Sequence, residues 1–375
     1  MTWCIELPEP FGVYLHIPFC ASKCDYCAFA TWTDRHHLTD AYLAALRTDI
    51  ARAVASGMPP ATSVFVGGGT PSMVAADDLA AVIGSIPVTA GAEVTVECNP
   101  DNVTVGLLRT YADAGVDRVS IGVQSMVTHV LGALGRQHAQ RNVEQAVAAV
   151  HAAGLRSFNL DVIYGGAGET LADWDTTLRA VVALDPPHVS AYALTIEPGT
   201  PLAEQPDRHP DDDDQADKYE LADTLLGGAG LENYEISNWA RPGHECRHNV
   251  LYWRQQNYRG FGCAAHSHES GRRWWNVRTP ERYIDLVNSN APTEASGETL
   301  DPATRQFESL ELQLRMRDGV PHDAFTPDDA TELEEQGLLV ERAGRWTLTR
   351  RGRLLANAIS LRLVTNGGEE VGEHS

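Results

Sequence analysis

The 375-residue sequence contains no apolar run near the length of about 20 residues that a membrane-spanning helix needs. Its first ten residues, MTWCIELPEP, have neither the basic segment nor the apolar segment of a signal peptide. Positive charge is scarce, since 29 Lys and Arg stand against 51 Asp and Glu, for a formal net charge of −22. This deficit opposes nonspecific attraction to phosphate backbones and anionic lipid, and we expect no nucleic-acid partner.

Cysteine is also sparse and odd in number, with seven residues in the chain. An odd count without a secretion signal argues against a disulfide framework and favours a reducing, cytoplasmic location. Hydrophobic residues make up 43% of the chain and charged residues 21%, which is an ordinary globular balance. The length allows two or three domains, or one large α/β barrel with an appendage.

The first two-thirds of the chain alternates β-branched runs with amphipathic helical runs. The expected strands cover residues 11–18, 62–68, 92–100, 117–125, 156–165 and 188–195. Six strand–helix units in succession predict parallel strands joined by right-handed crossovers. Two further units of a full eight-unit barrel are not evident, so the sequence favours an α/β fold with a partial (βα)6 barrel. A doubly wound sheet is the alternative.

The composition of the sequence changes after about Tyr234, where Trp, His and Arg become frequent. We therefore predict a barrel domain over residues 1–235 and a smaller C-terminal accessory domain over residues 236–375. Within the latter, residues 333–363 are typical of a helix, a glycine turn, a hairpin and a helix, as in a winged helix. The arginines clustered in this stretch could contact phosphates. The acidity of the whole chain instead favours a role for the stretch in packing or in contact with a partner.

Polar and glycine residues follow five consecutive expected strands. They are a cysteine-rich loop, the Gly67–Pro71 run GGGTP, Glu97, Gln124 and Asp161. Chemistry in parallel α/β folds gathers at the carboxyl ends of the strands. Any one of these residues could be structural, but five at one rim indicate a functional site.

The sharpest motif is CASKCDYC, in which Cys20, Cys24 and Cys27 have the spacing C-x3-C-x2-C. Structural zinc normally takes four ligands in two pairs, and no second pair is present, although a distant His or Cys could complete a tetrahedron. Three thiolates on one loop suit an iron–sulfur cluster with one iron free of protein ligands. The strand that leads into the triplet favours the cluster, with these three cysteines as its ligands.

A C-x3-C-x2-C triplet after the first strand of a partial barrel resembles the radical S-adenosylmethionine (SAM) enzymes. In that family the cysteines hold a [4Fe–4S] cluster, and the amino and carboxylate groups of SAM chelate the fourth iron. The motifs YLHIPFC, GGGTPS, VECNP, SIGVQS, LGRQH and NLDVIYG cover most of residues 11–200 in the family's order. They resemble the oxygen-independent coproporphyrinogen III oxidase-like group, which implies a barrel of the radical SAM type.

The resemblance also implies a SAM site at the predicted rim. Its residues are Tyr14, Gly68, Gly69, Thr70, Glu97, Gln124, Arg136 and Asp161. Glycines allow the backbone to approach a ligand closely, and carboxylates at strand ends suit ammonium groups or ribose hydroxyls. The resemblance assigns no catalytic residue.

This group divides into true oxidases and haem-chaperone relatives. The oxidases typically carry another cysteine where Phe29 stands here, and they have a long extension before the first strand. In addition, HNVLYW at His248–Trp253 matches the HNxxYW pattern of the chaperone branch. Imidazole is a common haem ligand and aromatic rings pack on macrocycles, so His248, Tyr252 and Trp253 are the predicted haem residues.

Three other side chains could serve as the haem ligand, namely Cys246, His266 and His268. The last two lie in CAAHSH, where the family commonly has glycine at the position of Ala264. The turn there is therefore expected to differ locally from that of relatives.

The resemblance implies a haem chaperone that carries a [4Fe–4S] cluster and SAM and delivers haem to respiratory haemoproteins. Membrane contact would then be peripheral and made through the recipient. The runner-up is an oxygen-independent coproporphyrinogen III oxidase that decarboxylates propionates by radical chemistry, an activity that we expect to be absent. A third hypothesis is a zinc-stapled nucleic-acid-binding protein that uses the winged helix.

Overall fold

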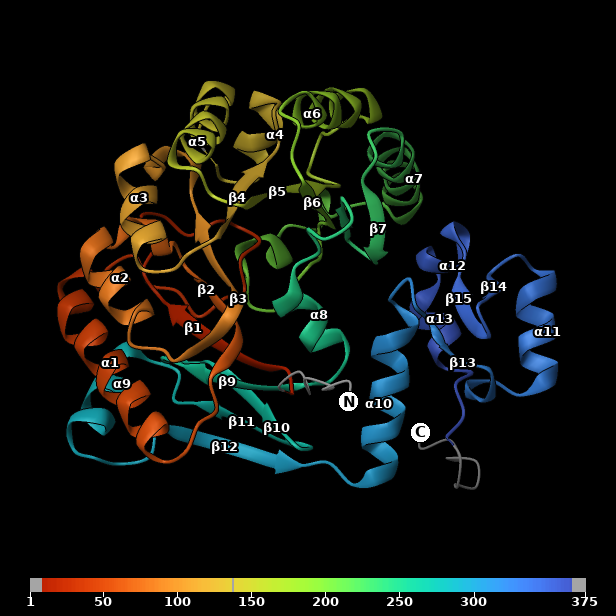
Figure 1. Cartoon of the computed structure of the whole chain (residues 1–375). Coiled ribbons are helices and arrows are strands. Elements are labelled where there is room, and N and C mark those ends of the chain that lie inside the picture. Colours follow the sequence, from red (N-terminus) through yellow and green to blue (C-terminus); the bar gives the residue numbers. More distant parts are fainter. Residues whose placement is uncertain (1–8, 137, 366–375) are drawn as a thin grey trace, which may run out of the picture.

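In the computed structural model, which describes residues 9–136 and 138–365, six parallel strands form the centre of the molecule (Figure 1). They are β1 (Phe11–Ile17), β2 (Ala61–Gly68), β3 (Val88–Cys98), β4 (Arg118–Gln124), β5 (Ser157–Tyr164) and β6 (His188–Ala193). Each strand pairs in parallel with the next along the chain. The predicted parallel α/β arrangement is therefore confirmed.

Helices connect these strands and cover the outer face of the sheet (Figure 1). They are α1 (Thr39–Ala55), α2 (Ala76–Ile83), α3 (Val105–Asp113), α4 (Thr128–Ala133), α5 (Gln140–Ala153) and α6 (Leu171–Ala183). Local sequence sets their ends. Thr170 and Asp173 form a capping box that starts α6, and Gly154, at φ +75°, ends α5 in the left-handed conformation that glycine adopts without strain.

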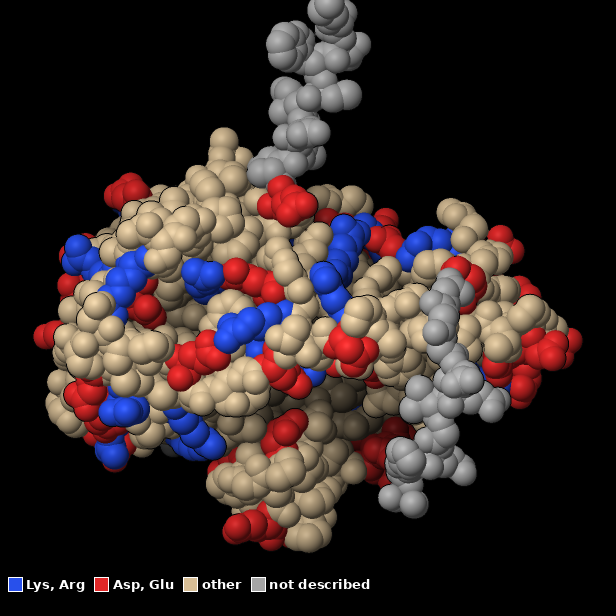
Figure 2. Space-filling view, turned by 90° about the horizontal axis from the view of Figure 1, so that it is seen from below, with Lys and Arg blue, Asp and Glu red and all other residues tan. Residues whose placement is uncertain are grey.

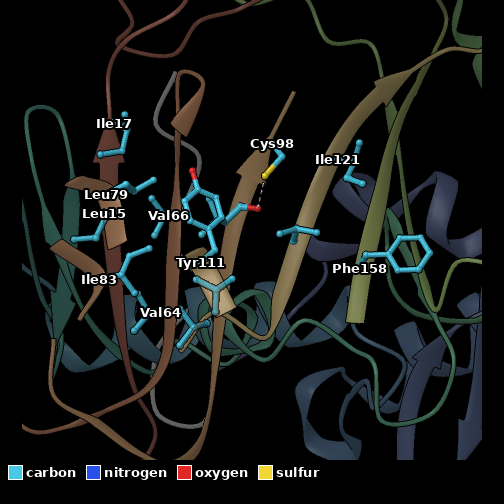
Figure 3. Close-up of a cluster of buried hydrophobic side chains, with 14 of the residues drawn as sticks. Leu15, Ile17, Val64, Val66, Leu79, Ile83, Cys98, Tyr111, Ile121 and Phe158 are labelled. Carbon is cyan, nitrogen blue, oxygen red and sulfur yellow. Dashed lines mark hydrogen bonds between the residues drawn. The ribbon is translucent and has the colours of Figure 1, made fainter. Parts of the chain in front are cut away.

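The core lies between the strands and these helices, as Figure 3 shows for part of it. Leu79 and Ile83 of α2 and Tyr111 of α3 lie against Val64 and Val66 of β2, and all five side chains are buried. The apolar face of each helix therefore packs on the apolar strands that it covers.

The sheet continues beyond the six parallel strands at both ends, and the barrel is not closed. On one side β8 (Asn238–Ala240) pairs antiparallel with β6, and β7 (Glu232–Glu235) follows it. On the other side β9 (Asn257–Phe261) pairs in parallel with β1. The sheet then ends with three antiparallel strands, β10 (His266–Glu269), β11 (Arg272–Asn276) and β12 (Glu294–Thr299). The boundary expected at residue 235 thus falls inside one twelve-stranded sheet.

Three helices belong to this C-terminal extension of the sheet. Helix α7 (Asp212–Gly228) precedes β7, and α9 (Pro280–Asn288) packs beside α1 (Figure 1). The short helix α8 (Arg247–Trp253) lies between β8 and β9 and carries the HNVLYW motif. The motif is therefore part of the barrel-bearing domain and lies next to β1 and β2.

A separate hydrophobic core begins at Leu310 and includes Trp346 and Ile359. Its elements are α10 (Pro302–Leu314), β13 (Val320–Pro321), α11 (Pro327–Glu335), β14 (Leu339–Arg342), β15 (Arg345–Leu348), α12 (Arg350–Leu354) and α13 (Ala356–Ser360). The predicted helix, glycine turn, hairpin and helix are present here. Helix α10 leads from β12 to this small domain (Figure 1).

Charged side chains of both signs are interspersed on the face seen in Figure 2, and no large basic patch covers it. Within residues 9–136 and 138–365, no helix combines the length and the apolar character that crossing a membrane requires.

Candidate radical SAM site

The loop after β1 carries the three cysteines, and backbone hydrogen bonds between its two ends close it at the base. Backbone hydrogen bonds join Cys20 N to Trp32 O at 3.1 Å and Trp32 N to Pro18 O at 2.8 Å. A further bond from Cys27 N to Cys24 O, also 3.1 Å, closes the segment between the second and third cysteines. The loop is thus a closed structure from which three thiols project.

The thiols are unpaired, and they fit a cluster better than a single ion. Burial is the main cause that raises the pKa of Cys20 and of Cys27, and the neighbouring cysteine sulfurs raise it further. Among the described residues, no three His, Cys, Asp or Glu side chains converge in the way that one tetrahedral ion requires. The irons of a four-iron cluster sit at separate corners, so its cysteines need not converge on one point.

The glycine run at the end of β2 makes room beside this loop. Gly68 has φ +110°, and a Cβ there would lie 2.6 Å from the His16 ring. A Cβ on Gly69 would lie 2.6 Å from Phe19 O and 3.0 Å from Cys20 Sγ. Gly69 N also donates a hydrogen bond to Ile17 O at 2.7 Å, so the run is locked against the start of the cysteine loop. Only glycine allows this approach.

A cavity of about 680 Å³ lies between the cysteine loop and the carboxyl ends of the strands. Ten of the predicted residues line it, namely Cys20, Cys24, Cys27, Gly68, Gly69, Thr70, Glu97, Gln124, Arg136 and Asp161. Their sequence positions span more than a hundred residues, and the parallel strands bring them to one rim. The volume is that of a site for a cofactor or small ligand.

Two carboxylates lie at the floor of this cavity. Burial, with Asp161 as the second cause, raises the pKa of Glu97 to about 8, although Gly68 N donates to Glu97 Oε2 at 3.1 Å. Burial also raises the pKa of Asp161, which accepts hydrogen bonds from Ser120 Oγ at 2.7 Å and Asn159 Nδ2 at 2.8 Å. The pair holds negative charge reluctantly when no cation is bound, so a cationic ligand would be favoured here.

The opposite wall supplies donors. The Nε atom of Arg136 is buried without a hydrogen-bond partner, and the Arg136 side chain is hydrogen-bonded to Tyr26. Gln124 is held at φ +62°, with its amide lining the cavity. An unpartnered guanidinium N–H is costly unless an acceptor arrives, which fits a carboxylate-bearing ligand.

Tyr14 is the predicted SAM residue that does not line this cavity. His16 Nε2–H donates to Ala30 O at 2.8 Å, which leaves His16 Nδ1 to accept from the Tyr14 hydroxyl at 3.0 Å. Tyr14 instead lines a neighbouring cavity of about 880 Å³, and it also lines a small cavity of about 150 Å³ together with Glu97 and Asp161. Its contact with SAM stays a prediction from the resemblance.

The cavity also has lining residues that the sequence analysis missed, among them Tyr26, Tyr192 and Glu197. Tyr192 lies near the end of β6 and is 42% exposed. The sequence signal that could identify it is an aromatic residue near the carboxyl end of the expected sixth strand.

The HNVLYW motif is enclosed on α8. His248 is 1% exposed, its Nδ1 lies 2.9 Å from Ser63 Oγ, and its Nε2 lies 2.8 Å from the Tyr252 hydroxyl. Its ring stacks on Phe65, and burial lowers the pKa of His248 to about 3. Both ring nitrogens are therefore engaged within the protein, which leaves none directed at a haem iron.

The neighbouring candidates differ among themselves. Cys246 is 4% exposed, and burial followed by Glu93 raises its pKa to about 12, which disfavours the thiolate. Tyr252 lines the neighbouring cavity, and Trp253 is half-buried with its Nε1 buried and unpartnered. Of the three predicted haem residues, His248 and Tyr252 line a small cavity of about 150 Å³, and Tyr252 alone also lines the larger neighbouring one.

Comparison with known proteins places this site in a class. The sequence profile of the Radical SAM superfamily matches residues 14–181, and that of the HemN C-terminal domain matches residues 300–355. The solved structure of coproporphyrinogen III oxidase (HemN) from Escherichia coli superimposes with a TM-score of 0.80 at 21% identity, covering 94% of this chain and 89% of that one. The fold and the site define a radical SAM protein of the coproporphyrinogen III oxidase-like group.

Relatives narrow the assignment further. The chain is 39% identical to "Heme chaperone HemW" of Mycobacterium tuberculosis, over 95% of this chain and 97% of that protein. It is 35% identical to the protein of the same name from Escherichia coli, over 95% and 98%. The chain belongs to the HemW family of radical SAM proteins.

Proposed function

We propose that this protein binds haem and delivers it to haemoproteins, since its relatives carry the name heme chaperone. The observation that carries the proposal is the match to those relatives over 95% of this chain. Phe29 supports it, because this residue occupies the place of the additional cysteine typical of the oxidases. The likeness to coproporphyrinogen III oxidase concerns the fold alone, at 21% identity.

Cys20, Cys24 and Cys27 would hold the [4Fe–4S] cluster in this proposal. SAM would lie in the 680 Å³ cavity against the residues already described, with Arg136 facing its carboxylate and the Glu97–Asp161 pair facing cationic or hydroxyl groups. When bound, the reduced cluster supplies the electron that cleaves the SAM sulfonium. The protein's part is to orient SAM and to keep the cysteine loop closed.

The recipients in this proposal are respiratory haemoproteins. The protein would reach them from the cytoplasm, and any contact with the membrane would be peripheral and made through the recipient. The small domain over residues 300–365 would contact the recipient in this proposal. It has a hydrophobic core of its own, separate from that of the sheet. We propose the same position, near residue 300, as the boundary between the two domains.

The proposal is tested by anaerobic cluster reconstitution, followed by hemin titration and an oxidase assay on the same sample. We expect a Soret shift that saturates with hemin and no conversion of coproporphyrinogen III. Robust conversion of coproporphyrinogen III would restore the oxidase hypothesis. Hemin uptake no tighter than that of an unrelated acidic protein would refute haem binding.

A further inference from the structure

A second cavity, of about 880 Å³, adjoins the proposed SAM cavity at Ala28 and Phe29, which line both. Its walls come from β1, the segment Ala28–Ala30, α8, the strands β9–β12 and the helix α10. Phe29 lines both cavities, and it is 61% exposed, which is unusual for a large apolar side chain. The two cavities therefore share a wall at the loop that carries the cysteines.

One imidazole in this second cavity is free to bind a metal. His266 lies exposed on β10, and its ring stacks on Trp275 with centroids 5.6 Å apart. No hydrogen bond or ion pair to another described residue engages its ring nitrogens. Partial burial of the ring, followed by Arg273, lowers the pKa of His266, which favours the neutral imidazole that iron binds.

The other histidine on the same face of β10 is held differently. His268 Nδ1–H donates to Gln256 O at 3.1 Å, and its Nε2 is buried without a partner. His268 is 5% exposed, so a macrocycle cannot reach Nε2 without displacing its neighbours. Together with the enclosure of His248, this leaves His266 as the accessible imidazole beside the cysteine loop.

The rest of the cavity has the mixed character that a macrocycle with carboxylate side chains requires. Tyr252, Tyr258, Trp275 and Phe29 supply aromatic and apolar surface. Arg278 is exposed at the wall, and within the part of the chain that the structure describes it forms no ion pair. By contrast, Arg273 is already paired with Glu298 and Glu308.

We propose that haem occupies this cavity with His266 as an axial ligand and with a propionate directed to Arg278. The inference rests on the proposed haem-binding function and specifies where that binding occurs. The HNVLYW motif then contributes a wall, because His248 fixes the Tyr252 ring through its hydroxyl. His248 is accordingly a positioning residue and not the ligand.

The test uses the full-length protein with its cluster reconstituted, titrated anaerobically with hemin. His266→Ala is the perturbation, His268→Ala is the matched control on the same strand face, and His248→Gln tests the motif. Losing even an outer partner of a metal ligand costs about 10–100-fold in affinity, so His266→Ala should weaken hemin binding at least about tenfold. The two other variants should keep the ligand-field spectrum of the wild type.

Rescue separates ligation from a structural role. In His266→Gly, added imidazole should restore the wild-type Soret position, and it should have no such effect on His248→Gln. Arg278→Gln should weaken hemin binding less than His266→Ala and should leave the ligand-field spectrum unchanged.

The outcomes distinguish the two levels of the proposal. If the wild type does not bind hemin, the proposed function fails. If the wild type binds hemin and His266→Ala and His266→Asn bind it equally well with unchanged spectra, this site is wrong while haem binding stands. Loss of the ligand-field signature in His248→Gln alone would likewise overturn the assignment and return the ligand to the HNVLYW motif.

Discussion

The Glu97→Gln substitution should change how the stability of the ligand-free protein depends on pH. Burial and Asp161 raise the pKa of Glu97 from 4.5 to about 8 in the folded chain. The folded state therefore binds this proton more tightly than the unfolded state, and stability falls as pH rises from about 4.5 to about 8. A change of this size corresponds to at most about 5 kcal/mol, at about 1.4 kcal/mol for each pH unit.

The glutamine variant carries no proton to lose, so its stability should not fall over that range. The measurement is urea unfolding of both proteins without cluster or SAM, at intervals from pH 5 to pH 8.5. The free energy of unfolding of the variant, minus that of the wild type, should increase with pH by up to about 1.4 kcal/mol per unit, and level off above pH 8.

A matched control comes from the same cavity. Glu197→Gln removes an exposed carboxyl there and should leave the profile parallel to that of the wild type. Parallel profiles for Glu97→Gln and the wild type would refute the reasoning, because they would mean that Glu97 ionises in the folded chain as easily as in the unfolded one.

Three further predictions concern the cysteine loop and its surroundings. Serine at any one of the three loop cysteines should prevent reconstitution of a cluster of about four irons, measured as iron and labile sulfide, whereas Cys263→Ser should not; stoichiometric zinc without sulfide in the wild type would contradict this. Gly69→Ala places a Cβ 2.6 Å from Phe19 O and should lower the free energy of unfolding by about 1–3 kcal/mol in urea titration, and an unchanged value would show that the loop can shift. Ala264 has φ +56°, so Ala264→Gly should relieve strain and raise that free energy by about 0.5–1 kcal/mol, while a decrease would count against strain at this turn.

Much of the fold was predictable because the six parallel strands are apolar runs separated by amphipathic helices. The continuation of the sheet beyond residue 235 was not, since the strands that extend it are short and lack that pattern. Every residue of β12 (Glu294–Thr299) is exposed, and β9 pairs with β1 across most of the sequence. Neither the position of β12 nor the pairing of β9 leaves a local sequence signal.

The convergence of the cysteine loop and the strand ends on one cavity could be predicted because the carboxyl ends of parallel strands meet at one rim. The enclosure of His248 could not be predicted in this way. The environment of His248 depends on Ser63 and Phe65, which lie on β2, more than 180 positions earlier in the chain. A motif written in consecutive letters shows which residues are present but not which of them face a cavity.

The pairing of β1 with β9 has a consequence for how the protein is made. Phe11 lies opposite Asn257, so the first strand emerges from the ribosome long before its second neighbour exists. At about 5–20 residues per second, the interval is roughly 10–50 seconds. During that time the edge of β1 that β9 later covers is open. The sheet around β1 is therefore completed only after β9 has been synthesised, and a chaperone that shields the open edge of β1 should raise the yield of folded protein.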